Sequence, residues 1–316
     1  MSELFQALKQ TAQTEQVAIQ NLSYFNYRFK KVRDITPFQQ LKKVKYLDLI
    51  GSDIVDISAL KELVDIETLT LTYSKISDLS PLRNMNKLEQ LDLGNNQIED
   101  ISVLEQLPVL KHLSLPYNPL KNASSFPFMT NLEGLDIGGT PKIKNFSFLK
   151  KLINLNTLSL YDNHLDDISF LKPLQKMNWL CLNYNSISNI SVLANLRELD
   201  FLWFTNNPVR DFSPLQNLPK LTRLTLVENK IIDISFLQKM ISLTDLVLDD
   251  NEIEDCSVIE HLFQLKTLSL SNNRIKDITP LLKLHCLKEL NIRGNLVDEK
   301  DKVIEELIEK GVKVVQ

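Results

Sequence analysis

Aspartate recurs at one position of an internal pattern in this sequence, and serine or threonine follows each of these aspartates two residues later. A column of carboxylates could bind calcium, but a Ca²⁺ site needs about six to eight oxygen ligands that converge on one point. Carboxylates about 22 residues apart would be held one per repeat, so we expect no metal site. We expect these side chains to accept hydrogen bonds from backbone N–H groups at the start of short helical turns. The aspartates are Asp56, Asp78, Asp100, Asp167, Asp211, Asp233, Asp255 and Asp277.

Histidine and cysteine offer no recognisable catalytic arrangement. The four histidines fall at four different positions of the internal pattern, so no two of them form an obvious pair. Cys181 is expected on an exposed strand position beside Trp203, but the sequence supplies no base to activate it. No phosphate-binding or dinucleotide-binding glycine motif is present. We therefore predict a non-enzymatic protein without a cofactor, and treat a Cys181 nucleophile as a minor alternative.

The stretch LDFLWF (199–204) places large aromatic side chains where a strand would expose them. Successive side chains of a strand point to opposite faces. If Leu199, Leu202 and Phe204 face a core, Phe201 and Trp203 face the other way. Exposed aromatic clusters of this kind are typical of binding surfaces.

A repeat of 22 residues explains these positions. The segments LEQLDLGNNQIEDISVLEQL (88–107) and LKTLSLSNNRIKDITPLLKL (265–284) share the frame L-x-x-L-x-L-x-x-N-x-I-x-D-I-[ST]-x-L-x-x-L. We count thirteen units, with one extra residue inserted near GGTPKI (138–143). In each unit L-x-x-L-x-L is a short strand with its leucines inside. The asparagine is expected to bond backbone groups that the turn would leave buried. The early units carry Lys30, Ser52 and Ser74 there, so we expect weaker asparagine bonding in them.

This frame is identified as the leucine-rich repeat in its 22-residue class. The sequence resembles internalin repeat domains, whose units also read NxIxDISxLxxL, and it is similar to the leucine-rich-repeat regulatory subunit of phosphatase-1. The resemblance covers about residues 22–297. It implies an α/β fold, a right-handed solenoid with a parallel concave sheet and short helical or 3-10 segments on the convex side. Function is left open by it, since such repeats bind many different partners.

The two ends of the chain are predicted to cap the repeats, because a terminal repeat would otherwise expose its apolar flank. We predict an N-terminal helical cap over residues 1–21, repeats over 22–297, and a helix and strand as a C-terminal cap over 298–316. The C-terminal segment places apolar residues on one helical stripe, Gly311 ends that helix, and VKVV could add a last strand.

The exposed strand positions give the candidate site. The third, fifth and seventh residues of each unit are predicted to face the concave side, with part of the eighth. Both tryptophans of the chain fall in these columns on adjacent repeats. We predict that a partner protein binds around Trp179, Phe201 and Trp203, with Tyr161, Tyr184 and Arg223 beside them and Asp136, Asp200 and Asp245 steering the approach. The other interpretation of the aromatic side chains is that they pack on one another and stiffen the sheet.

The charge pattern restricts the class of partner. The net charge is −4, which argues against nucleic acid. Acidic residues around the aromatic columns favour a basic partner. The resemblance to the phosphatase regulator suggests an alternative function as an inhibitory subunit that occludes an enzyme's active site. Self-association through the concave face is a further alternative. No membrane contact is expected, and the three scattered cysteines with no apolar leader predict a cytoplasmic location, with secretion left open.

Overall fold

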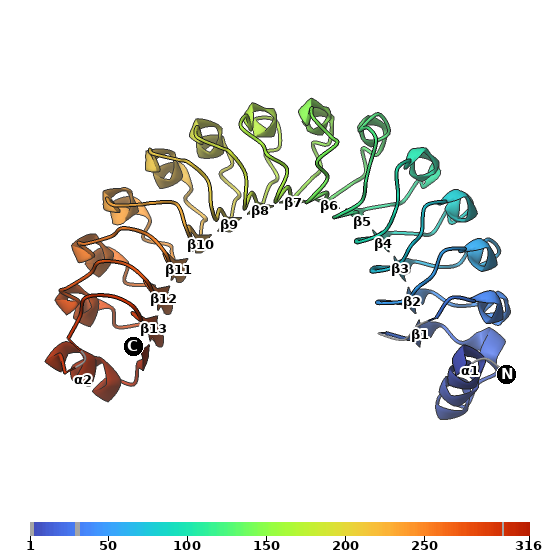
Figure 1. Cartoon of the computed structure of the whole chain (residues 1–316), viewed down its shortest axis with the longest axis horizontal. Coiled ribbons are helices and arrows are strands. Elements are labelled where there is room, and N and C mark those ends of the chain that lie inside the picture. Colours follow the sequence, from blue (N-terminus) through green and yellow to red (C-terminus); the bar gives the residue numbers. More distant parts are fainter. Residues whose placement is uncertain (1–2, 29–31, 299) are drawn as a thin grey trace. The chain divides into compact units, whose positions relative to one another are not determined.

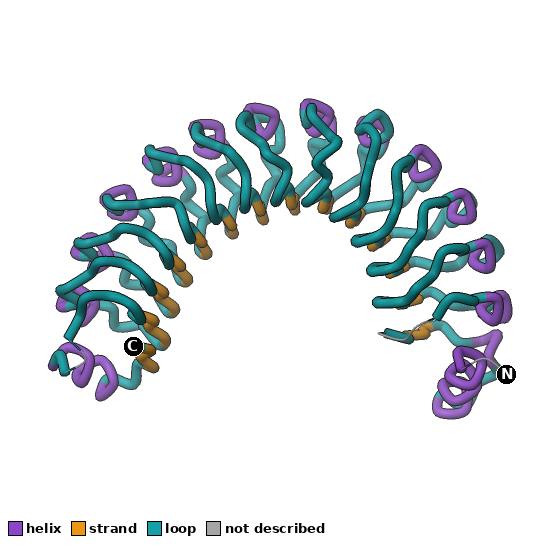
Figure 2. The backbone as a smooth tube through the Cα atoms, in the orientation of Figure 1, coloured by secondary structure: helices purple, strands orange, loops and turns teal. Residues whose placement is uncertain are grey.

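The computed structural model of the chain describes residues 3–28, 32–298 and 300–316. It divides into two compact units, Met1–Leu155 and Asn156–Gln316. In each unit short strands line one side and short 3-10 helices line the opposite side (Figures 1 and 2).

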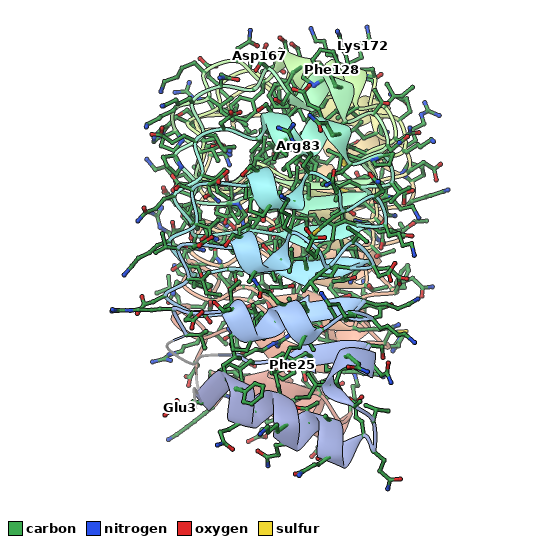
Figure 3. The ribbon with its side chains drawn as sticks, turned by 90° about the vertical axis from the view of Figure 1, so that its right-hand side faces the viewer. Glu3, Phe25, Arg83, Phe128, Asp167 and Lys172 are labelled. Atoms are coloured by element: carbon green, nitrogen blue, oxygen red, sulfur yellow. The ribbon has the colours of Figure 1, made fainter. Side chains whose placement is uncertain are left out.

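The described part of the first unit begins with helix α1 (Glu3–Thr14) and continues with parallel strands that pair in chain order. The strands are β1 (Tyr24–Asn26), β2 (Tyr46–Asp48), β3 (Thr68–Thr70), β4 (Gln90–Asp92), β5 (His112–Ser114) and β6 (Gly134–Asp136). The 3-10 helices are η1 (Ile19–Asn21), η2 (Thr36–Gln40), η3 (Ser58–Leu60), η4 (Ser80–Leu82), η5 (Ser102–Gln106), η6 (Phe126–Phe128) and η7 (Ser147–Lys151). Figure 3 shows side chains of this unit, among them Phe128, which is 68% exposed.

The second unit has the same organisation and ends with an α-helix and a last strand. Its strands are β7 (Thr157–Ser159), β8 (Trp179–Cys181), β9 (Phe201–Trp203), β10 (Arg223–Thr225), β11 (Asp245–Val247), β12 (Thr267–Ser269), β13 (Glu289–Asn291) and β14 (Lys313–Val315). Its helices are η8 (Ser169–Leu171), η9 (Ser191–Asn195), η10 (Ser213–Asn217), η11 (Ser235–Lys239), η12 (Ser257–His261), η13 (Thr279–Lys283) and α2 (Lys302–Glu309). The predicted leucine-rich-repeat fold, with parallel strands and short 3-10 segments, is confirmed.

Leucine columns hold the strands in register. Leu202 pairs with Leu224, and Leu224 with Leu246. All three side chains are at most 1% exposed. A shift of one residue would turn the whole leucine set toward solvent, so burial fixes the register. It also fixes which residues flank each leucine on the opposite face of the sheet.

In the repeats that carry it, the asparagine bonds the backbone as predicted. The Nδ2 group of Asn251 donates to the carbonyl oxygens of Leu226 at 2.8 Å and Leu248 at 2.8 Å. Its Oδ1 accepts from the backbone N–H of Ile231 at 3.0 Å. In an early repeat, Ser74 donates its hydroxyl to the carbonyl oxygen of Ser52 at 2.9 Å. Lys30, which holds this position one repeat before Ser52, lies outside the described residues.

The recurring aspartates also have the predicted structural role. Asp56 Oδ1 accepts from the backbone N–H of Ser58 at 2.7 Å, and Oδ2 accepts from the Ser58 hydroxyl at 3.0 Å. The same pair of bonds forms between Asp233 and Ser235. Each aspartate therefore stabilises the first residue of a 3-10 helix. The part of the chain that the structure describes contains no group of three or more histidine, cysteine, aspartate or glutamate side chains that could hold a metal.

The eighth residue of the repeat has a left-handed backbone conformation, which the sequence analysis did not anticipate. Asn206 has φ of 52° and Tyr184 has φ of 55°. Gly139 has φ of 61° at the equivalent position, and a Cβ atom there would meet the ring of Tyr117 at 2.4 Å. Gly139 therefore serves the regular turn of the repeat, where glycine is strain-free.

Both described termini carry an amphipathic helix. Helix α1 buries Leu4 and Leu8. Asp301 accepts from the N–H of Val303 at the start of α2, and Gly311, with φ of 86°, follows the end of that helix. Strand β14 then pairs in parallel with β13. The division of the chain into two caps and a repeat region stays a prediction.

Candidate partner-binding surface

Three of the predicted site residues form one aromatic cluster, which we define as Trp179, Phe201 and Trp203. They lie on β8 and β9, where Trp179 is paired in register with Phe201. The ring centroids are 5.9 Å apart for Trp179–Phe201, 5.3 Å for Trp179–Trp203 and 5.0 Å for Phe201–Trp203. All three contacts are edge-to-face, the geometry that aromatic quadrupoles favour.

The aromatic cluster is packed together and still open to solvent. Trp203 is 38% exposed, whereas Trp179 and Phe201 are partly buried. The two interpretations of these side chains are therefore compatible: the rings stabilise one another, and Trp203 presents the accessible part of the surface.

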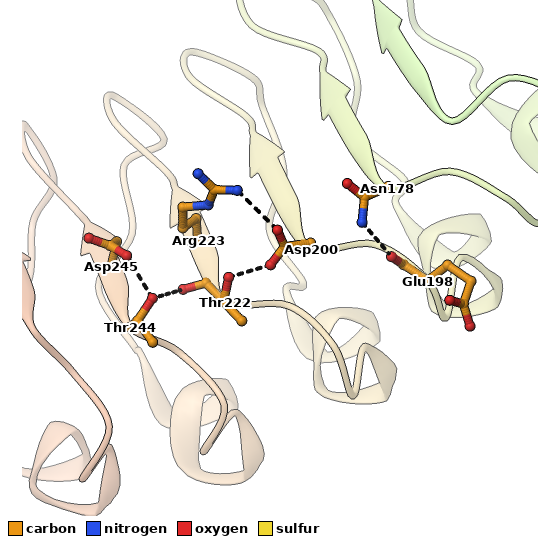
Figure 4. A network of polar contacts seen from close by, with 7 residues as sticks. All are labelled: Asn178, Glu198, Asp200, Thr222, Arg223, Thr244 and Asp245. Atoms are coloured by element: carbon orange, nitrogen blue, oxygen red, sulfur yellow. Dashed lines mark hydrogen bonds and ion pairs between the residues drawn. The ribbon is translucent and has the colours of Figure 1, made fainter. Parts of the chain in front are cut away.

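Arg223 closes one side of the aromatic cluster. Its guanidinium carbon lies 4.6 Å from the centroid of the Phe201 ring, a cation–π contact. Its Nη2 atom is 3.0 Å from Asp200 Oδ2. Asp200 Oδ1 also accepts from the hydroxyl of Thr222 (Figure 4). Arg223 is thus bound on two sides by groups of this chain.

The Asp200 carboxylate is a structural partner rather than an unpaired charge. Burial alone would raise the pKa of Asp200, but the hydrogen bonds from Thr222 and Arg223 and the charge of Arg223 outweigh it and lower that pKa. Asp200 is therefore ionised at neutral pH and neutralised locally by Arg223. The steering role of Asp200 stays a prediction, and the sequence could not show this contact between neighbouring repeats.

Asp245 lies on the next strand, beside Arg223 in register. Its Oδ2 accepts from the hydroxyl of Thr244 at 2.6 Å (Figure 4). Among the described residues Asp245 has no ion pair, so its negative charge remains available on this face.

The two tyrosines lie beyond the carboxyl ends of β7 and β8. Tyr184 is 52% exposed and Tyr161 is partly buried. Tyr184 holds the left-handed position of its repeat, and its backbone N–H donates to the carbonyl oxygen of Thr205 at 2.8 Å. Tyr184 belongs to the repeat that carries Trp179, and Tyr161 belongs to the repeat before it.

Asp136 is in the first unit, on β6, so the structure does not relate it to the aromatic cluster. Its Oδ1 accepts from the backbone N–H of Gly138 at 3.0 Å, which gives it a role in the local turn. Gly134, on the same strand, is buried, and a Cβ atom there would meet His112 Nδ1 at 2.5 Å. The His112 side chain therefore already occupies the space beside this glycine.

The predicted exposure of Cys181 is wrong. Cys181 is only 3% exposed. It lies between Trp179, two residues earlier on β8, and Trp203, its partner in register, and a small side chain next to two indoles is shielded from water. Cys256 is buried as well, and burial raises the pKa of its thiol to about 12. Neither buried thiol is suited to act as a nucleophile.

Comparisons with known proteins agree with the repeat frame. The family model described as "Leucine Rich repeats (2 copies)" matches residues 65–106 and 264–302. A search of curated proteins found no match. Among solved structures, an internalin (inlF) from Listeria monocytogenes is 29% identical with a TM-score of 0.84, and the match covers 100% of this chain and 94% of that chain.

More distant structures share the fold. A leucine-rich-repeat protein from Leptospira interrogans is 21% identical with a TM-score of 0.73, over 100% of this chain and 86% of that chain. The ectodomain of the Arabidopsis thaliana receptor kinase GASSHO1/SCHENGEN3, in complex with CASPARIAN STRIP INTEGRITY FACTOR 2, is 18% identical with a TM-score of 0.59, over 92% of this chain and 42% of that chain.

None of the described helices of the present chain is both long and apolar enough to cross a membrane. This chain is a leucine-rich-repeat protein whose repeats resemble those of internalins.

Proposed function

We propose that the chain is a non-catalytic protein-binding module that docks a partner protein on the strand face of its second unit, centred on the aromatic cluster. The observation that carries the proposal is the exposure of Trp203 within a packed group of three aromatic rings. Such a group offers a large apolar contact area in a fixed conformation, so little side-chain entropy is lost when a partner covers it. The ectodomain of GASSHO1/SCHENGEN3, which shares the fold, was solved with a bound partner.

The surroundings of the aromatic cluster support this site. Arg223 is held by Phe201 and Asp200, so it keeps the Phe201 ring in place without a partner. Tyr184 and Asp245 extend the surface on either side and remain accessible to a partner, since Tyr184 is exposed and Asp245 is partly exposed. Preorganised aromatic anchors with polar neighbours are typical of binding hot spots.

Alanine substitution tests the site. Trp203→Ala and Phe201→Ala are each expected to weaken binding by about 2 kcal/mol or more, the scale of hot-spot residues. The measurement is calorimetric titration with a partner recovered from cell lysate, with Phe128→Ala as control because Phe128 is exposed in the other unit. If the double variant Phe201→Ala/Trp203→Ala binds the partner with the same affinity as the wild-type chain, the partner binds elsewhere.

The same complex tests the other expectations. Loss of catalytic activity in a captured enzyme would support the inhibitory alternative, and sedimentation of the purified chain would reveal self-association. The cytoplasmic location and the absence of nucleic acid among the partners stay predictions.

A further inference from the structure

A less polar strip continues from the aromatic cluster along the sheet of the second unit. Thr225 lies beside Trp203 in register, and Val247 lies beside Thr225. Both side chains are half-buried, and so is Val227, two residues after Thr225. Adjacent strands are about 4.8 Å apart, so the column from Trp203 to Val247 spans about 10 Å. A short segment of a partner can therefore lie across these three strands.

Carboxylates border this strip where β10 and β11 end. Glu228 follows β10, and Asp249 and Asp250 follow β11. Glu228 Oε2 accepts from Asn206 Nδ2 at 3.0 Å, and Asp250 Oδ1 accepts from Asn272 Nδ2 at 2.8 Å. Asp249 Oδ1 accepts from a serine hydroxyl at 2.6 Å and from a backbone N–H at 2.7 Å. Because these donors are neutral, they position the carboxylates and leave their negative charges unbalanced.

The described residues of the second unit supply no ion pair for Glu228, Asp249 or Asp250. The lysines and arginines that form ion pairs in this unit bind other acids, which are Glu198, Asp200, Glu252, Glu260 and Glu306. Arg223, the cation beside the aromatic cluster, is bound to Asp200. Lys230 lies two residues after Glu228 and is exposed, but within the described residues it forms no ion pair with that carboxylate. Further along the sheet, the repeats of β12, β13 and β14 carry Lys266, Lys288, Arg293 and Lys313.

The left-handed backbone at this position does not favour glutamate. Glu228 has φ of 56°, the left-handed position at which the flanking repeats have Asn206 and Asp250. Asparagine and aspartate adopt this conformation more readily than glutamate does. A longer acidic side chain at this position therefore costs conformational energy, while it adds a charge beside the strip.

We infer that the partner presents a basic protein segment whose apolar side chains cover Trp203 and Val247 and whose lysine or arginine side chains pair with Glu228, Asp249 and Asp250. The inference rests on the proposed function, because it assigns the chemistry of the partner at that same site. A partner that covers the strip also displaces some of the water around the carboxylates at its border, and this displacement is favourable only where opposite charges pair with them. An acidic segment would instead meet unbalanced negative charge.

Intrinsic fluorescence gives a direct assay, because the only two tryptophans of the chain both belong to the aromatic cluster. The probes are a synthetic peptide that alternates leucine with arginine and a matched peptide that alternates leucine with glutamate. At low salt the basic peptide should bind and change the tryptophan emission, whereas the acidic peptide should not. The double variant Glu228→Asn/Asp250→Asn should bind the basic peptide about fivefold more weakly, the combined effect of two exposed ion pairs.

A matched double variant controls for net charge. Asp166→Asn/Glu254→Asn makes the same change in charge at exposed positions of the second unit outside the strip, and should bind as the wild-type chain does. Equal loss in both double variants, or equal binding of the two peptides, would overturn the inference. If Trp203→Ala abolishes binding while Glu228→Asn/Asp250→Asn does not weaken it, the charge assignment fails and the proposed function stands. Binding that Trp203→Ala leaves unchanged would remove the proposed function, and this inference with it.

Discussion

At the level of single residues, Tyr184 is placed where the backbone favours another residue type. Its φ of 55° lies in the left-handed region, and the next repeats carry Asn206 and Glu228 at this position. Bulky residues adopt this conformation at a cost, while asparagine is several-fold enriched in it. Tyr184 is also 52% exposed, so burial does not repay that cost. Tyr73 and Tyr117 hold the same position with φ of 56° and 55°, so what distinguishes Tyr184 is its place in the repeat that carries Trp179.

Replacement of this tyrosine should separate stability from binding. Tyr184→Asn is expected to raise the free energy of unfolding by up to about 1 kcal/mol, because it relieves the left-handed strain. It should at the same time weaken partner binding, because it removes a ring beside the aromatic cluster. Urea unfolding and calorimetric titration measure the two effects.

Tyr73→Asn is the matched control for this prediction. Tyr73 holds the same position with φ of 56° and is 62% exposed, but it lies in the first unit. It should give the same gain in stability without a loss of binding. If Tyr184→Asn and Tyr73→Asn affect binding equally, Tyr184 has no special part in the site.

Residue types and spacing predicted the aromatic columns but not how their side chains meet. The frame placed Trp179, Phe201 and Trp203 on one face of adjacent repeats, and the ring contacts follow from that placement. The frame did not show that the Arg223 side chain forms an ion pair with Asp200 of the preceding repeat, because the repeat period does not determine side-chain rotamers. It also placed Cys181 in solvent, because a column assignment ignores the size of the neighbouring side chains.

At the level of elements, the asparagine of each repeat links consecutive turns. Asn251 accepts from the backbone N–H of Asn229 at 3.0 Å and of Ile231 at 3.0 Å, and donates to two carbonyl oxygens. One buried side chain thus bonds several backbone groups that water cannot reach. The serine at the same position in an early repeat, Ser74, donates one bond of this kind.

Loss of the asparagine should therefore cost far more than loss of the serine. Asn251→Ala leaves several buried backbone groups unpaired, at about 1–3 kcal/mol each, so we expect the free energy of unfolding to fall by about 3 kcal/mol or more. Ser74→Ala should cost about 1 kcal/mol. Urea unfolding followed by circular dichroism measures both. Similar losses for the two variants would contradict the role assigned to the ladder.

The strands, the asparagine bonds and the aspartate turns could all be predicted, because each depends on one residue type that recurs with the period. The left-handed eighth position could not, because its occupants differ: Tyr117, Asn206, Glu228, Asp250 and Gly294 all adopt it. A signal was nevertheless present, since glycine occupies this column at Gly51, Gly139 and Gly294. Glycine in a column of otherwise unrelated residues points to a backbone requirement rather than a side-chain one.

At the level of the whole chain, contacts within and between the repeats stabilise the charged forms of both acidic and basic side chains. The backbone N–H and then the hydroxyl of Ser58 lower the pKa of Asp56, and the hydroxyl and backbone N–H of Ser213 lower that of Asp211. A hydrogen bond and the charge of Glu67 raise the pKa of Lys45. Each shift means that the charged form binds its partner better in the folded chain than in the unfolded one.

These pKa shifts predict that the stability of the fold decreases at both low and high pH. The folded pKa of each aspartate lies below its ordinary value of 3.8, so its contribution is complete above pH 3.8 and is lost as the pH falls through the lower folded value. The folded pKa of Lys45 lies above 10.5, so its contribution is complete below that pH and is lost as the pH rises through the folded value. The melting temperature should therefore fall below about pH 4 and above about pH 10.5.

Replacement of the aspartates by asparagine tests the predicted loss of stability at low pH. Asparagine is a suitable replacement because this chain already uses it at the same position of another repeat. Asn145 Oδ1 accepts from the backbone N–H of Ser147 at 2.8 Å, so an amide keeps the turn without a titrating group. The variant Asp56→Asn/Asp211→Asn should have a melting temperature near that of the wild-type chain at pH 7. At pH 3 it should lose less of that melting temperature than the wild-type chain does, as followed by circular dichroism. Equal losses in the two chains at pH 3 would show that other carboxylates, and not the aspartates of the turns, set the acid limit of the fold.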